Sequence, residues 1–121
     1  MEMMDPQTAA TAELIERFND VFQKHDPTPL PSMIAEHCVI EKISPAPEGD
    51  RCAGRDACVG LWTEIATAPG TRFDLEESWA SGDRAVIRWR LWNNGSIAIR
   101  GVNLMRVRNG LIVEAMGYVK G

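Results

Sequence analysis

The C-terminal half of the chain has a two-residue hydrophobic period interrupted by three turn signals, and this pattern constrains the fold more than any other feature. The turn signals are Ser81-Gly82-Asp83, Asn93-Asn94-Gly95 and Asn109-Gly110. They separate four runs, about residues 73–80, 84–92, 97–108 and 111–120, in which apolar and polar side chains alternate. Alternation of this kind indicates strands with one buried face, and short turns join antiparallel neighbours. The sequence therefore predicts a four-stranded antiparallel meander.

The N-terminal half has a helical period instead. Asp5-Pro6 is typical of a helix start, because Asp accepts hydrogen bonds from free backbone amides and Pro suits the first helical position. Apolar residues from Leu14 to Phe22 then form one stripe, and a second stripe predicts a helix over residues 56–66. Prolines between the two leave room only for a short helix around residues 32–36. A strand at residues 37–43 and a loop at residues 44–50 follow.

These elements together predict an α+β fold. The four C-terminal runs all exceed the usual strand length of about 5 to 6 residues, so the sheet has to bend. We expect a strongly curved antiparallel sheet, closed by about three N-terminal helices around an apolar pocket. At 121 residues the chain has the usual size of one domain, and we expect residues 1–121 to form a single one.

Charge placement predicts which strand faces point inward. Ile87, Trp89 and Leu91 alternate with Arg88 and Arg90 and should face the helices. In the next run the arginine-free face carries Gly101, Asn103, Met105 and Val107, and we expect it to be the inner one. This choice places a lone amide, that of Asn103, among apolar neighbours.

The face of the last strand depends on the turn at Asn109-Gly110. A two-residue turn and a three-residue loop with Gly110 in a bulge differ by one residue, which exchanges the two faces. The unbroken apolar set on one face favours the bulged loop, and its small members would leave room for a ligand. That set is Val113, Ala115, Gly117 and Val119.

Charge and cysteine usage exclude several classes of partner. The net charge of −4 gives no attraction for nucleic acid or for anionic membranes, and no apolar run approaches the ~20 residues of a membrane span. Residues 1–12 lack the features of an export signal, so we expect a cytoplasmic protein.

Cys38, Cys52 and Cys58 have neither zinc-site nor disulfide spacing and should be reduced thiols. His25 and His37 lack metal-ligand spacing, so we expect no metal.

The segment from Arg100 to Gly110, the ending Tyr118-Val119-Lys120-Gly121 and the helix start Gly54-Arg55-Asp56 carry a family resemblance. The chain resembles the nuclear-transport-factor-2-like (NTF2-like) superfamily, in particular its bacterial branch of SnoaL-like and ketosteroid-isomerase-like proteins. The resemblance implies a cone-shaped fold and a homodimer. The superfamily contains isomerases, polyketide cyclases, epoxide hydrolases, dehydratases and binding modules without catalysis, so fold alone does not give the activity.

Comparison with ketosteroid isomerase argues against that particular reaction for this chain. That enzyme uses a carboxylate base and an oxyanion site of one tyrosine and one protonated aspartic acid. By resemblance Phe18 stands in the place of the tyrosine and Asn103 in that of the acid, while the base position falls on Lys42 or Ser44. An asparagine can still donate a hydrogen bond through its amide.

Three residues are candidates for catalysis: Glu41 as general base, Asn103 as hydrogen-bond donor and His37 as an aid to proton transfer. Glu41 would serve if its strand face, shared with Val39 and Ile43, is the inner one. If Cys38 and Ile40 face inward instead, Glu41 is a solvated charge. Asn103 could equally be a core amide, and His37 a structural residue.

The predicted pocket wall is apolar, and each of its residues could equally belong to an ordinary core. The leading hypothesis is a cofactor-independent isomerase or cyclase that moves a proton on a small hydrophobic carbonyl compound. The alternative is a non-catalytic binding or assembly module. Trp92, Val102, Leu104, Met116 and Tyr118 on the outer face predict a homodimer contact. The expected wall residues are Phe18, Phe22, Trp62, Trp89, Met105, Ala115 and Gly117.

Overall fold

The computed structural model describes residues 5–120. Two α-helices and six strands follow one another, with a single 3-10 turn at Leu30–Ser32 after the first helix. The elements are α1 (Pro6–Gln23), β1 (Ile34–Glu41), β2 (Arg51–Ala53), α2 (Arg55–Thr67), β3 (Thr71–Ser81), β4 (Arg84–Asn93), β5 (Ser96–Arg108) and β6 (Leu111–Val119).

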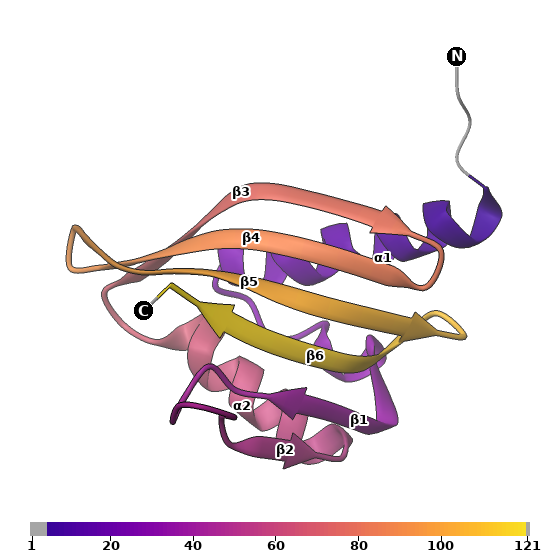
Figure 1. Cartoon of the computed structure of the whole chain (residues 1–121), viewed down its shortest axis with the longest axis horizontal. Helices are drawn as coiled ribbons and strands as arrows, with labels where there is room; N and C mark the ends of the chain where they lie inside the picture. The colour runs from indigo at the N-terminus through magenta and orange to yellow at the C-terminus, as the bar shows by residue number, and fades with distance from the viewer. Residues whose placement is uncertain (1–4, 121) are drawn as a thin grey trace.

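The six strands form one curved sheet in the order β2-β1-β6-β5-β4-β3. Both helices lie on the same side of this sheet, behind it in Figure 1. We call the side that carries the helices the inner face and the other side the outer face. The meander β3 to β6 was predicted correctly, but β1 pairs with β6 in parallel, so the sheet is mixed and not wholly antiparallel.

The expectation of about three helices is wrong in the segment between α1 and β1. Its prolines allow one 3-10 turn only, and the chain is already extended at Ile34, two residues after the turn ends. Ile34 is fully buried and aligns with Ile112 of β6, so pairing with the sheet wins over helix formation. The strand therefore starts three residues earlier than predicted, at Ile34 and not at His37.

Helix α1 begins and lies as its sequence requires. The Asp5 carboxylate accepts a hydrogen bond from the amide of Thr8 at 2.8 Å, which is the cap expected of Asp before Pro. The hydroxyl of Thr11 donates to the Gly82 carbonyl at 2.7 Å, and the Gln23 amide donates to the Phe73 carbonyl at 2.8 Å. These two bonds hold both ends of α1 against the β3–β4 hairpin.

Helix α2 is joined to β1 at one end and to the end of α1 at the other. The Arg55 guanidinium donates to the Ile34 carbonyl at 2.8 Å, and a ring nitrogen of His25 lies 2.8 Å from the Ala66 carbonyl. Cys58 and Trp62 are buried on its inward side. The two helices thus cover different parts of the inner face and leave a space between them.

The register of β6 differs from the expectation near its start. Asn109 and Gly110 both have positive φ, of 52° and 75°, and form a two-residue turn between Arg108 and Leu111. The bulge comes later, at Val113, so Ile112 is the buried residue at the start of the strand. Past the bulge, Ala115 is buried, as the alternation predicted.

The three cysteines are free thiols. Cys38 and Cys58 are buried, and the Cys58 thiol donates to the Cys38 carbonyl at 3.4 Å. Burial, reinforced by the nearby Cys58, raises the pKa of the Cys38 thiol to about 12. Cys38 therefore stays protonated at neutral pH and serves as a core residue.

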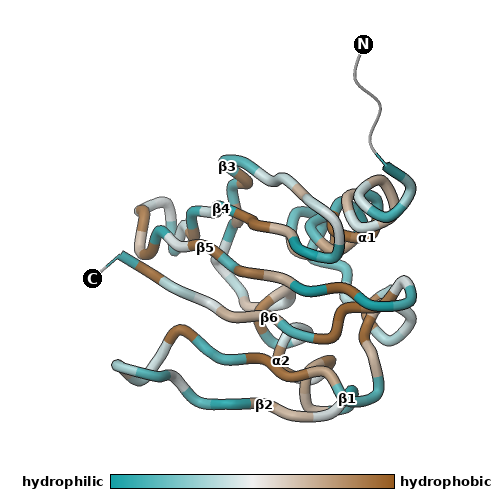
Figure 2. The backbone as a smooth tube through the Cα atoms, turned by 45° about the vertical axis from the view of Figure 1, so that its right-hand side comes forward, coloured by the Kyte–Doolittle hydropathy of each residue, from teal (hydrophilic) through white to brown (hydrophobic). Residues whose placement is uncertain are grey.

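Hydropathy changes from residue to residue along β4 and β5 in Figure 2, as the burial of only one face of these strands requires.

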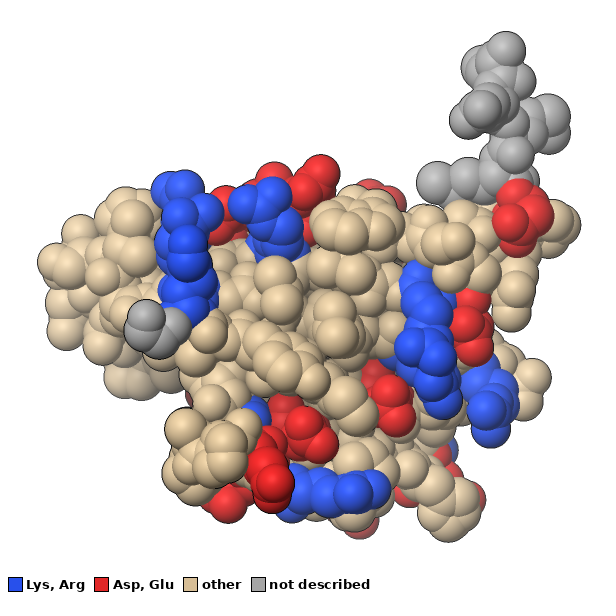
Figure 3. Space-filling model, in the orientation of Figure 1, with Lys and Arg blue, Asp and Glu red and all other residues tan. Residues whose placement is uncertain are grey.

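A charged network lies on the outer face beside an uncharged area. Glu76 accepts hydrogen bonds from Arg88, Arg90 and Arg100 at 3.0 to 3.4 Å. Figure 3 shows lysine and arginine side chains on both sides of an uncharged middle region of this face. Leu104 of β5 and Tyr118 of β6 are exposed. No helix within residues 5–120 is both long and apolar enough to cross a membrane.

Candidate functional site

A cavity of about 210 Å³, open on one side, lies between the inner face of the sheet and the two helices. Its wall is mostly apolar and draws on residues far apart in the sequence. The lining residues are Phe18, Asn19, Phe22, Gln23, Ile40, Glu41, Lys42, Ile43, Leu61, Trp62, Ile65, Phe73, Asp74, Leu75, Ile87, Trp89, Leu91, Ile99, Asn103, Ala115 and Gly117.

Aromatic rings in edge-to-face contact form a continuous part of the wall. Phe18 packs against Trp62 with ring centroids 4.8 Å apart and against Phe22 at 5.0 Å. Phe22 contacts Phe73 at 5.8 Å, and Phe73 contacts Trp89 at 5.7 Å. Such contacts contribute beyond simple burial and fix the ring positions, so this part of the wall is preformed.

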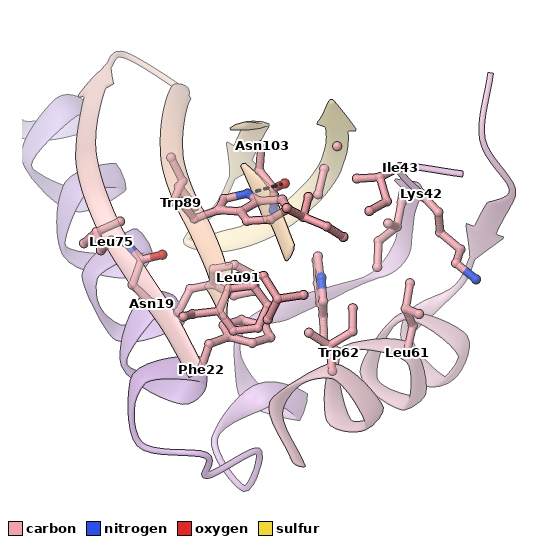
Figure 4. Close-up of a pocket in the computed structure, with 18 of the residues that line it drawn as sticks. Asn19, Phe22, Lys42, Ile43, Leu61, Trp62, Leu75, Trp89, Leu91 and Asn103 are labelled. Atoms are coloured by element: carbon pink, nitrogen blue, oxygen red, sulfur yellow. Dashed lines mark hydrogen bonds between the residues drawn. The ribbon is translucent and has the colours of Figure 1, made fainter. Parts of the chain in front are cut away.

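Asn103 is the amide that faces the cavity from the sheet. The indole nitrogen Nε1 of Trp89 donates a hydrogen bond to Oδ1 of Asn103 at 3.2 Å (Figure 4). Because an indole N–H is only a donor, it requires the oxygen side of the amide and fixes the orientation of Asn103. Within residues 5–120 the Nδ2 group has no protein partner, and it is not among the fully buried unsatisfied atoms, so it is open to the cavity.

Two glycines make this arrangement possible. A Cβ at Gly101 would lie 2.6 Å from the Trp89 ring, so the indole lies directly over the backbone of β5. A Cβ at Gly117 would lie 2.8 Å from the Ile43 side chain and 3.6 Å from Oδ1 of Asn103. The missing side chain at Gly101 therefore gives the indole its place, and the one at Gly117 lets Ile43 and the Asn103 amide lie close to the β6 backbone.

The charged lining residues have partners or positions that turn them away from the cavity. Asp74 accepts a hydrogen bond from Nε1 of Trp92 at 2.6 Å and lies 3.3 Å from the Arg72 guanidinium. Figure 4 shows the Lys42 side chain directed away from the cavity. No group of three or more His, Cys, Asp or Glu side chains within residues 5–120 is placed to hold a metal ion.

Glu41 lies on the wall through its backbone. Its carbonyl oxygen is 3.6 Å from the position of a Cβ on Gly117. In β1, Cys38 and Ile40 are the buried residues, and Ile40 aligns with buried Ala115. Glu41 aligns with Met116, whose side chain belongs to the outer face. The inner face of β1 is therefore the one that carries Cys38 and Ile40. The expectation that the Glu41 side chain shares an inner face with Val39 is wrong.

The other expected site residues divide into two groups. His37 is exposed and is not part of the wall. Met105 is buried, but it lies in the core beyond the cavity, where it aligns with Ala115. The remaining expected residues are brought together around the cavity with Asn103: Phe18, Phe22, Trp62, Trp89, Ala115 and Gly117.

Sequence reasoning missed several wall residues that its own pattern could have found. Phe73 and Leu75 align with Leu91 and Trp89, and Ile99 also aligns with Leu91. Each therefore shares the inner face with residues already assigned to it. Asn19 was missed for a different reason, because it lies next to Phe18 at the margin of the helix stripe, where a polar residue predicts solvent.

Comparisons with known proteins agree with this architecture. The model of the SnoaL-like domain matches residues 15–115. An NTF2-like protein of unknown function from Mesorhizobium loti is 64% identical, with 98% of each chain covered and a TM-score of 0.94. A search of functionally curated proteins gave no match.

More distant solved structures share the fold only. A steroid delta-isomerase from Pseudomonas aeruginosa is 18% identical, with 96% of this chain and 83% of that chain covered and a TM-score of 0.79. A candidate SnoaL-like polyketide cyclase from Jannaschia is 13% identical, with 99% and 92% covered and a TM-score of 0.75. Because the domain match spans most of the sequence, the chain belongs to the SnoaL-like family of NTF2-like proteins.

Proposed function

We propose that this protein binds a small hydrophobic carbonyl compound in the cavity between α1, α2 and the inner face of the sheet. The observation that carries the proposal is the free Nδ2 group of Asn103, a donor without a protein partner within residues 5–120, set in a mostly apolar wall. A carbonyl oxygen would satisfy this donor, and the aromatic rings would bury the rest of the ligand.

The size of the cavity limits the ligand. A cavity of about 150 Å³ holds a single benzene ring, and pockets for drug-sized ligands start at about 300 Å³. At about 210 Å³ this cavity suits a compound of one or two rings. A four-ring skeleton would extend out of the open side, so a steroid is a poor match even though a steroid isomerase shares the fold.

Binding of 1-indanone, a two-ring ketone, tests the proposal by calorimetric titration. Asn103→Leu keeps a similar side-chain size but removes the donor, and it should weaken binding of the ketone by about tenfold, the value of one hydrogen bond in a desolvated site. Indane, the same skeleton without oxygen, should bind both proteins about equally. Equal affinity of both proteins for the ketone would remove Asn103 from the proposal.

A second candidate function is catalysis of the isomerase or cyclase type. Two observations favour it: the chain belongs to the SnoaL-like family, and the Glu41 backbone borders the cavity near Asn103. Glu41 would remove a proton next to the carbonyl while Asn103 stabilises the resulting oxyanion. Its carboxylate would have to turn around the end of β1 to reach the ligand.

Deuterium exchange at the carbon next to the carbonyl of 1-indanone separates the two functions. An enzyme should accelerate this exchange, and Glu41→Gln should abolish the acceleration without changing ketone affinity. Glu36→Gln is a matched control, because Glu36 lies on the same strand, is exposed and is not part of the wall. A purely binding protein would leave the exchange rate of the bound ketone at its solution value or below.

We also propose that the protein forms a homodimer through the outer face. Val102 aligns with Tyr118, and Leu104 aligns with Met116, so the four side chains form one apolar group on this face. Leu104 and Tyr118 are about half exposed, at 43% and 51%. Covering this group with a second copy would remove it from water.

A further inference from the structure

We propose that Trp89 determines the polarity of the pocket: by holding Oδ1 of Asn103, it makes the cavity select ligands that accept hydrogen bonds over ligands that donate them. The inference rests on the proposed function, because it concerns which ligands the same cavity takes. Trp89 itself acts through Asn103 and is a positioning residue.

An unconstrained asparagine does not distinguish donors from acceptors. Its amide carries an oxygen that accepts and an NH2 group that donates, and rotation by 180° about the last side-chain bond exchanges the two. A pocket with a freely rotating amide would therefore bind a ketone and an N–H compound about equally well. Selectivity requires a neighbour that can bond to only one end of the amide.

Trp89 is such a neighbour. Its indole nitrogen has a hydrogen and no lone pair available to accept, so it bonds only to Oδ1, at 3.2 Å. The flipped amide would place two donors against each other and leave both without an acceptor. An unsatisfied donor in a largely desolvated site costs enough free energy to make the flipped orientation of the amide about tenfold or more less populated than the observed one.

The indole cannot easily move away from this position. On one side it lies over Gly101, where even a methyl group would be only 2.6 Å from the ring. On another side Phe73 contacts it edge-to-face at 5.7 Å between centroids. Trp89 and Gly101 also align across β4 and β5, so strand pairing fixes the indole against the backbone.

The other polar wall side chains of residues 5–120 are engaged elsewhere or lie away from this pair. Lys42 is directed away from the cavity in Figure 4, and Glu41 aligns with Met116 of the outer face. Gln23 uses its NH2 group on the Phe73 carbonyl, and Asp74 accepts from Trp92. Asn19 lies near Leu75 on the α1 side of the cavity in Figure 4, away from the Trp89–Asn103 pair. Polar recognition from the sheet therefore depends on the one amide whose orientation Trp89 sets.

Two probes of similar size and opposite polarity test the inference: 1-indanone, which only accepts, and indole, which donates through its N–H. The wild type should bind 1-indanone about tenfold more tightly than indole. In Trp89→Phe the amide is free to rotate, so indole should bind more tightly and the preference should fall to about twofold or less. Trp92→Phe is the matched control, because Trp92 donates to Asp74 and is not part of the wall.

A merely structural role of Trp89 would weaken both probes alike and leave their ratio unchanged, which would overturn the inference. If neither probe binds the wild type, the proposed function fails and this inference fails with it. Binding of both probes with one ratio in all three proteins overturns the inference alone.

A second variant covers the case in which Trp89→Phe does not fold. Asn103→Leu removes the amide, so the preference for 1-indanone over indole should fall to about twofold or less, and an unchanged preference would overturn the inference. A ligand-free readout is the indole proton resonance of Trp89, which should shift upfield in Asn103→Leu while that of Trp92 stays unchanged. An unchanged Trp89 resonance would contradict the contact itself.

Discussion

Nε1 of Trp89 lies 3.2 Å from Oδ1 of Asn103, and this one contact decides which end of the amide faces the cavity. The two residues are 14 positions apart and come together because β4 and β5 pair through a hairpin at Asn94-Gly95. Gly101 gives the indole its place on the sheet. The chemistry of the pocket thus depends on a residue that carries no side chain.

Gly101→Ala should destabilise the protein and weaken ligand binding together. The new methyl group would lie 2.6 Å from the Trp89 ring and 2.7 Å from the Tyr118 carbonyl, so both neighbours would have to move. Overpacking of this kind costs about 1 to 3 kcal/mol. Urea denaturation and titration with 1-indanone measure the two effects.

Gly60→Ala is the control for the glycine experiment. Gly60 lies in α2, and a Cβ there meets no atom within 4 Å. Replacing a glycine inside a helix with alanine should stabilise the protein by about 0.5 to 1 kcal/mol and leave binding unchanged. A Gly101→Ala protein as stable as the wild type would show that the indole is not confined.

Glu76→Gln should lower stability at neutral pH and make little difference in acid. Hydrogen bonds from Arg100 lower the pKa of the Glu76 carboxyl, with Arg90 adding to the effect and partial burial opposing it. A lowered pKa in the folded state stabilises the protein above the unfolded value of about 4.3, and this contribution is lost as the pH falls through the folded value. Urea denaturation at pH 7 and pH 3 measures it.

Glu77→Gln is the matched control for the acid experiment, because Glu77 is more exposed and pairs with Arg88 alone. This substitution should lower the free energy of unfolding by at most about 1 kcal/mol at pH 7, as for other exposed ion pairs. If wild type and Glu76→Gln differ in free energy of unfolding by the same amount at pH 7 and pH 3, ionisation of Glu76 does not stabilise the fold.

Alkylation should separate the three cysteines. With a pKa of about 12, Cys38 has a thiolate fraction of only about one in ten thousand at pH 8, and it is also buried. Cys58 is buried too, whereas Cys52 on the edge strand β2 is partly exposed. Iodoacetamide in the folded protein should therefore label Cys52 first and all three in urea, as mass spectrometry can follow. Labelling of Cys38 as fast as Cys52 would contradict the buried position of β1.

Leu104→Arg should convert the proposed dimer into a monomer. The charge would be placed in the middle of the apolar group on the outer face, where a partner would have to desolvate it. Ile97→Arg is the control, because Ile97 is similarly exposed but lies at the start of β5, beside the hairpin turn. Light scattering measures both. A wild type that is monomeric at high concentration would exclude this contact.

Much of the fold could be predicted because local signals agreed with the final packing. Asp5-Pro6 marked the start of α1, and the alternation around Trp89 gave the inner face of β4 correctly. Strand β2 was missed because its three residues are too few to show a period. The parallel pairing of β1 with β6 brings together segments some 75 positions apart, and nothing local in either strand announces it.

The site was harder to predict because one-residue differences decide it. The face of β1 depends on whether Ile40 or Glu41 points inward, and the sequence has apolar residues on both faces. In β6 the Asn109-Gly110 turn and the bulge at Val113 offset each other, so Ala115 is inward as expected although the turn is of the other type. The bond between Trp89 and Asn103 has no signature in either strand alone.

A crystal structure of the protein soaked with 1-indanone tests the central claim most directly. We expect a flat ligand against Phe22 and Trp62, with its carbonyl oxygen about 2.9 Å from Nδ2 of Asn103 and with the Trp89 bond intact. A cavity filled by side chains, or a ligand whose oxygen points away from Asn103, would contradict it.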